Sequence, residues 1–275
     1  MANIVPYLRR IKNNMENAIE NGGAQAQTSL IRSGKLINEL HEFIKEELIE
    51  RGINGFNISP HRGQTNPEIT LFGSFKKKAQ DVTVLPSVEM ATPERIKEGP
   101  LYGEIDPIGS DRSNRSIAIN VRSQLSSLRK NYDTLYERTF AEPLNLHLRL
   151  PRLVMGEVYM VPVDAYDPEE MKSRRVAFEE RLPQSYVPSF LALNDRNMEK
   201  GEEYKYERVA LLIVDFREDP PRIVDDAGEL SSLGIVTSGM EEKPGIESLS
   251  IRTFIDDLLK KYKERHGSLE LLQQD

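Results

Sequence analysis

The segment "SIAINVRSQLSSLRKNYDTLYERTFAE", residues 116–142, decides the fold because it joins a strand pattern directly to a helix pattern. Apolar residues alternate with small or polar ones in its first part: Ile117, Ile119 and Val121. In its second part they recur at spacings of three and four: Leu125, Leu128, Tyr132, Leu135, Tyr136 and Phe140. The first spacing predicts a strand that buries one face more deeply, and the second predicts a helix that starts near Leu125.

Charged residues mark the junction of these two patterns. Arg122 ends the strand, and the helix that follows carries the carboxylates Asp133, Glu137 and Glu142. Such an arginine can form a structural ion pair with one of them. It can also face a bound anion, and the sequence leaves both interpretations open.

The same periodicities place the other elements. Helices are expected at about 3–20, 30–51 and 251–265, and strands at 69–72, 81–85, 153–163 and 209–216. Residues 86–115 are polar, with Pro, Gly and Ser, and are expected to form a loop that can include a short helix. Together these elements predict an α/β (α+β) fold with a mixed central sheet flanked by helices. No linker or repeat divides the chain, so we expect one domain over residues 1–275, with its core at about 30–220.

Composition excludes several classes of protein. With 38% hydrophobic residues the 275-residue chain can bury a core, and no apolar run approaches the roughly 18–20 residues that span a bilayer. We therefore expect a soluble, cytoplasmic protein. The absence of cysteine excludes disulfides, thiolate zinc sites and cysteine nucleophiles, and the four histidines show no metal-binding spacing. Any metal would be a hard cation held by carboxylates.

The charge balance bears on nucleic-acid binding. A net charge of −7 argues against a protein that coats nucleic acid through bulk charge. Basic and acidic residues are nevertheless unevenly distributed, and "FKKKAQ", "HLRLPR" and "MKSRRVAFEER" are basic or mixed. A basic cleft on an acidic body remains compatible with this pattern, as do solvated helix faces.

Three segments together resemble a known family, although phosphate-loop, dinucleotide-binding, GxSxG and HExxH motifs are all missing from the sequence. They are "RSGKLINELHEFIKEELIERG", "QDVTV" and "INVRSQLSS". They resemble the core of the PD-(D/E)XK nuclease superfamily, and specifically a type II restriction endonuclease. The resemblance implies a restriction-endonuclease-like core and Mg²⁺-dependent, sequence-specific hydrolysis of double-stranded DNA within a restriction-modification system.

The resemblance also assigns catalytic residues. It matches Glu39 to the helix glutamate and Asp81 to the metal-binding aspartate of the first strand. Asn120-Val121-Arg122 falls at the (D/E)XK triplet but departs from it twice, because Asn120 replaces the acid and Arg122 replaces the lysine. In one branch of the family the acid has moved to the following helix, and Glu137 lies at a matching distance. The implied metal ligands are therefore Asp81, Glu39 and Glu137, with Arg122 as the catalytic cation.

DNA-contacting residues are expected in three places. Phosphate contacts are expected at the start of the helix and in the basic turn: Ser123, Gln124, Lys76, Lys77 and Lys78. Base contacts are expected between residues 165 and 205, from Arg174, Arg175, Gln184, Asn194 and Arg196, whose side-chain types suit guanine and adenine edges. A palindromic target would imply a symmetric homodimer.

Two alternatives stay open. The substitutions at Asn120 and Arg122 favour a catalytically degenerate nuclease-fold protein that binds DNA without cutting it. The acidic net charge favours a protein-interaction module with no nucleic-acid role.

Overall fold

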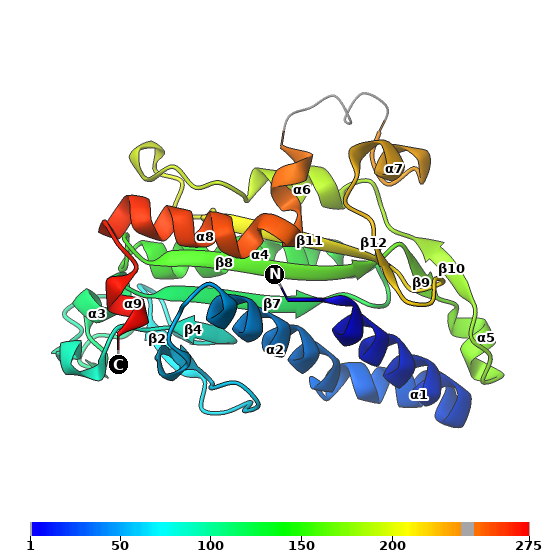
Figure 1. The fold of residues 1–275 in the computed structure, drawn as a ribbon, viewed down its shortest axis with the longest axis horizontal. Helices are drawn as coiled ribbons and strands as arrows, with labels where there is room; N and C mark the ends of the chain where they lie inside the picture. Colours follow the sequence, from blue (N-terminus) through cyan, green and yellow to red (C-terminus); the bar gives the residue numbers. More distant parts are fainter. Residues whose placement is uncertain (1, 238–244, 275) are drawn as a thin grey trace.

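A mixed six-stranded sheet organises the protein, in a computed structural model that describes residues 2–237 and 245–274 (Figure 1). Its strand order is β1-β4-β7-β8-β11-β12, and helices cover both faces. The strands of this sheet are β1 Ile58–Ser59, β4 Val82–Val84, β7 Ile117–Ser123, β8 Val154–Pro162, β11 Arg208–Asp215 and β12 Arg222–Ile223. The helices are α1 Val5–Arg32, α2 Lys35–Glu50, α3 Ser110–Asn114, α4 Tyr132–His147, α5 Pro168–Lys172, α6 Tyr186–Ala192, α7 Ala227–Ser232, α8 Ile251–His266 and α9 Glu270–Gln273. The expected mixed α/β class is confirmed.

Strand directions follow from the connections. β4 runs antiparallel to β7, whereas β7, β8 and β11 are mutually parallel neighbours. The parallel pair β7 and β8 is joined through α4, as parallel strands require a crossover. In this register Asn120 lies beside Glu157, and Ile119 lies beside Val82. The quoted segment is therefore the centre of the sheet and its covering helix.

Two hydrophobic cores lie on opposite faces of the sheet. Ile117, Ile119 and Val121 of β7 pack into the core that includes apolar side chains of α1, α2 and α8. Ala118 of the same strand belongs to the second core, with apolar side chains of α4 and α6. Successive residues of β7 therefore point alternately into the two cores, so both faces of this strand are buried, as expected for the interior of a mixed sheet.

Among the described residues, three two-stranded antiparallel ribbons accompany the central sheet. They are β2 Ile69–Phe72 with β3 Lys77–Gln80, β5 Glu94–Arg95 with β6 Ile105–Asp106, and β9 Asp164–Tyr166 with β10 Phe178–Arg181. The β2–β3 ribbon carries the basic turn and ends one residue before Asp81. The sequence allowed a short helix within the expected loop at 86–115, and α3 is such a helix, whereas the β5–β6 ribbon was not expected.

The expected strands at 69–72, 81–85, 153–163 and 209–216 are confirmed to within two residues at each end. The expected helix start at Leu125 is wrong, because α4 begins at Tyr132. Ser127 has a φ of 53° there, which no helical turn accommodates, and the Glu180 carboxylate accepts hydrogen bonds from the next two backbone amides. Tertiary contacts therefore replace the first turns that the apolar spacing predicts.

The N-terminal helix is longer than its pattern indicated. α1 bends at Gly23, with a φ of 66°, and continues to Arg32. A side chain at this glycine would place its Cβ 2.8 Å from the carbonyl oxygen of Met171, so close packing against α5 also requires glycine. Within the described ranges, no helix combines the length and apolarity needed to cross a membrane.

Candidate active site

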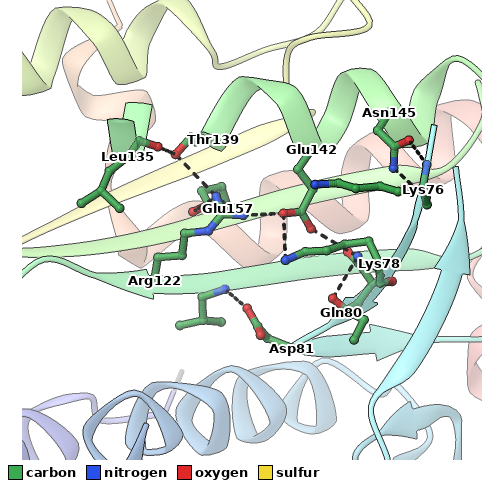
Figure 2. Close-up of polar contacts among 12 residues, drawn as sticks. Lys76, Lys78, Gln80, Asp81, Arg122, Leu135, Thr139, Glu142, Asn145 and Glu157 are labelled. Carbon is green, nitrogen blue, oxygen red and sulfur yellow. Dashed lines mark hydrogen bonds and ion pairs between the residues drawn. The ribbon is translucent and has the colours of Figure 1, made fainter. Parts of the chain in front are cut away.

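A polar cluster lies where α4 crosses the ends of β3 and β7 (Figure 2). Arg122 is at its centre, with 22% of its side chain exposed. Its Nη1 donates to both carboxylate oxygens of Glu157 on β8 at 3.0 Å, and its Nη2 donates to Glu142 of α4 at 2.5 Å. The guanidinium therefore bridges two carboxylates from two different elements.

The β2–β3 ribbon adds further contacts to Glu142. Lys78 Nζ lies 3.3 Å from one carboxylate oxygen of Glu142, and Gln80 Nε2 donates to the other at 3.2 Å. Asn145, one turn later on α4, accepts hydrogen bonds from the backbone amides of Phe75 and Lys76. One face of α4 thus fixes the basic turn and places Lys78 next to Arg122 (Figure 2).

Asp81 lies on the other side of β7 from this cluster in Figure 2. Its Oδ2 accepts a hydrogen bond of 2.7 Å from the backbone amide of Val121. The carboxylate is half-buried, which leaves part of it accessible. Asp81 therefore contacts the middle residue of the Asn120-Val121-Arg122 segment.

Electrostatic coupling extends the cluster to two residues that the sequence did not single out. Burial lowers the pKa of His41 on α2, while the nearby charge of Asp81 opposes that shift. The pKa of Glu68 is raised by burial and then by the charge of Asp81. The ladder register explains the second effect, since Ile69 pairs with Gln80 and the preceding residue therefore lies opposite Asp81.

The buried carboxylate of Glu157 responds to the same charges. Burial raises its pKa to about 8, and Glu142 and Asp81 act in the same direction against the opposing charge of Arg122. Burial alone would lower the pKa of the Arg122 guanidinium, but Glu157, Tyr206 and Glu142 outweigh it and raise that pKa. The arginine remains charged, while Glu157 retains a proton more readily than an exposed glutamate.

Two of the expected carboxylates lie elsewhere. Glu39 faces α1 and forms an ion pair of 2.6 Å with Arg10. His41 is two residues further along α2, about 200° around the helix, and the charge of Asp81 influences its pKa. Glu137 is exposed on α4, and the carboxylates that orient Arg122 are Glu142 and Glu157.

The expected DNA-contacting residues are divided between surface and interior. Lys76, Lys77, Arg174, Arg175 and Gln184 are exposed, and Ser123 and Lys78 are half-buried. Three others are buried and serve the fold: Gln124, Asn194 and Arg196. Gln124 accepts hydrogen bonds from the hydroxyls of Tyr159 and Tyr186, which removes it from a phosphate-binding position.

Asn194 and Arg196 have structural partners. Asn194 accepts a hydrogen bond from the amide of Val209 at 2.8 Å. Arg196 contacts the buried carboxylate of Glu207 at 3.2 Å. Neither side chain can reach a base edge in this conformation.

Four residues of this region were not predicted from the sequence as site residues, and only some of them could have been recognised there. Glu157 is a lone acid within an apolar strand, "LVMGEVYMV", and such an acid is buried only at a cost that a partner must offset. Glu142 stands at the end of the opening segment, but the misplaced helix start favoured Glu137. His41 and Glu68 have no local signal, because their proximity to Asp81 arises from strand pairing and helix packing.

A hard cation is compatible with the oxygen donors of this cluster. Mg²⁺ commonly uses one or two protein carboxylates together with water and substrate phosphate. Asp81 and Glu142 can supply two, but they lie on opposite sides of β7, so one ion could bind both only after their side chains move (Figure 2). Over residues 2–237 and 245–274, however, no three His, Asp or Glu side chains form a ready metal-binding group. Glu142 would have to loosen its contacts with Arg122 and Lys78 to bind an ion.

Comparison with known proteins adds no assignment, since no family model, curated protein or solved structure matches this chain.

Proposed function

We propose that this protein is a sequence-specific, Mg²⁺-dependent endonuclease that hydrolyses phosphodiester bonds of double-stranded DNA, as a type II restriction enzyme does. One observation carries the proposal. Asp81 is hydrogen-bonded to the backbone between Asn120 and Arg122, and Glu142, Lys78 and Arg122 meet beside this segment. The order α2, β4, β7, α4 is also the order that the family resemblance implies.

Each side chain has a defined task in this proposal. Asp81 and Glu142 would hold the metal ion, which supplies a more acidic water and neutralises developing charge when bound. Lys78 and Arg122 would stabilise the negative charge of the scissile phosphate. Arg122 is a poor proton acceptor, because its pKa lies above that of a free guanidinium. Its contribution is therefore electrostatic.

This proposal assigns the helix carboxylate to Glu142 in place of Glu137. Glu142 is 6% exposed and faces Arg122 and Lys78, whereas Glu137 points to solvent five residues earlier on α4. Glu39 is paired with Arg10, whereas His41 is an α2 side chain whose pKa is influenced by the charge of Asp81.

The test is cleavage of mixed-sequence duplex DNA in Mg²⁺, followed by sequencing of the ends. We expect defined ends from the wild-type chain and a loss on the order of 10²-fold or more in Asp81→Asn and Glu142→Gln. Both variants should still bind DNA in Ca²⁺. Glu137→Gln and Glu39→Gln are matched controls that should cut at near wild-type rates. Unchanged cleavage in Asp81→Asn would remove this assignment.

A second candidate is a DNA-binding protein that has lost cleavage. Arg122 is engaged by Glu142 and Glu157, and Asn120 offers an amide in place of the family's acid. This candidate predicts tight, salt-dependent binding of duplex DNA with no cut ends in Mg²⁺.

The proposed function also suggests a homodimeric state and a cytoplasmic location. A palindromic recognition site would be bound by a homodimer, with each copy cutting one strand. Restriction of incoming DNA would place the protein in the cytoplasm.

A further inference from the structure

A polar loop between α2 and β2 projects from the protein beside α2 (Figure 1). Ser59 Oγ donates to the carbonyl oxygen of Pro67 at 3.0 Å, which closes the base of the loop at residues 60–67. Every residue from 61 to 67 is exposed. We call residues 60–67 the proline-flanked loop, since Pro60 and Pro67 are its ends.

A buried lysine holds the backbone of this loop. Only 1% of the Lys45 side chain is exposed. Its Nζ donates to the carbonyl oxygens of Gln64 at 2.7 Å and His61 at 3.3 Å, and to Glu42 at 2.7 Å. The second oxygen of Glu42 accepts from the Gly63 amide at 2.7 Å. Burying an ammonium group is costly, and here its hydrogen bonds fix the shape of a surface loop.

Because the backbone polar groups turn inward, the side chains turn outward. His61, Arg62, Gln64 and Asn66 are exposed, and the segment contains no acidic residue. Phe56, with 81% of its surface exposed, packs edge-on against His61 at 6.2 Å between ring centroids. Arg, Gln and Asn are the side chains that form paired hydrogen bonds with guanine and adenine. A loop held rigid before binding loses less entropy on binding.

The loop is also close to the proposed reaction centre. It continues through Glu68 into β2, and Glu68 lies opposite Asp81. If the scissile phosphate of duplex DNA lies at Asp81, this loop is therefore within reach of the neighbouring base pairs.

We propose that the proline-flanked loop contacts duplex DNA next to the cleaved phosphate and contributes to sequence preference through Gln64 and Asn66. This inference rests on the proposed function. It places base reading outside the range of residues 165–205 in which the sequence predicts it, and two of the residues expected there, Asn194 and Arg196, are buried.

The experiment is fluorescence anisotropy with labelled duplex DNA in Ca²⁺, so that binding is measured without cleavage. The variant Gln64→Ala/Asn66→Ala should bind at least about tenfold more weakly, the loss expected from one good base contact. Asn21→Ala/Gln25→Ala removes the same two side-chain types from the exposed surface of α1 and should bind as the wild type does.

The possible results distinguish failure of the loop assignment from failure of the nuclease proposal. Normal DNA binding by the wild type with equal affinity and equal sequence preference in the loop variant would overturn the loop assignment alone. A wild-type chain that binds no duplex DNA would overturn the nuclease proposal, and the loop assignment with it.

Discussion

At the scale of single residues, Arg122 links the strand-to-helix segment to the rest of the fold. It is held by Glu142 and by Glu157, which is fully buried. Removing one member of a buried ion cluster leaves the other charges unpaired, and this costs more free energy than the intact pair contributes. Stability and any catalytic role are therefore coupled in this side chain.

Arg122→Ala should lower the free energy of unfolding by about 3–5 kcal/mol, because it leaves the Glu142 carboxylate without its arginine and removes the hydrogen bonds that Glu157 accepts. Arg122→Lys should lose less, since lysine keeps the charge but not the planar fork that contacts two carboxylates. Urea denaturation measures both. Arg129→Ala is the control, because Arg129 is 71% exposed and lies 3.9 Å from Glu180. A value for Arg122→Ala as small as that of Arg129→Ala would exclude a buried ion cluster.

The raised pKa of Glu157 should make the free energy of unfolding depend on pH. Its folded-state pKa is raised to about 8 by burial, above that of an unfolded glutamate. The folded state then binds more protons, so stability from this group is present below pH 4.5 and declines as pH rises toward 8. Glu157→Gln should remove this decline, which is on the order of a few kcal/mol. Urea unfolding at pH 6 and pH 9 measures this loss of stability in the wild type and in Glu157→Gln. An equal change in the free energy of unfolding between the two pH values in both proteins would contradict the raised pKa of Glu157.

At the scale of elements, close packing of α8 on β8 depends on a glycine. A Cβ on Gly156 would lie 2.7 Å from Cζ of Phe254 and 3.2 Å from Cδ2 of Leu258. Both side chains are buried in the core on this face of the sheet. The helix can approach the strand only because this position has no side chain.

Gly156→Ala should therefore destabilise the protein by about 1–3 kcal/mol, as overpacking of a core does. Thermal and urea unfolding provide the measurement. Gly55→Ala is the matched control, since its Cβ would meet only Ile49 at 3.9 Å. Equal stability of Gly156→Ala and the wild type would mean that α8 can move away from β8 without cost.

At the scale of the whole molecule, one sheet separates two cores, and the candidate site lies where β3, β7, β8 and α4 meet. The proposed symmetric DNA target gives a prediction at this scale. Sedimentation velocity should show a homodimer bound to one palindromic duplex. A single copy on that duplex would contradict the dimer and leave the chemistry of Asp81 untouched.

The sequence by itself determined the element types wherever side-chain spacing is a local property. The alternation around Ile119 predicts β7, the apolar run from Val209 to Phe216 predicts β11, and the strand pattern that follows Asp81 places this acid at a strand start. Each of these follows from neighbours within a few residues, which strand and helix periods encode directly. The mixed sheet followed from the order of such elements.

Only the tertiary structure decided which charges meet. Glu142 reaches Arg122 because Ser127 delays the start of α4, and the packing of α2 on the sheet brings His41 within the electrostatic influence of Asp81. A shift of a few residues in a helix start rotates every later side chain by about 100° per residue, so local spacing cannot select the right carboxylate. Long-range packing fixes that phase.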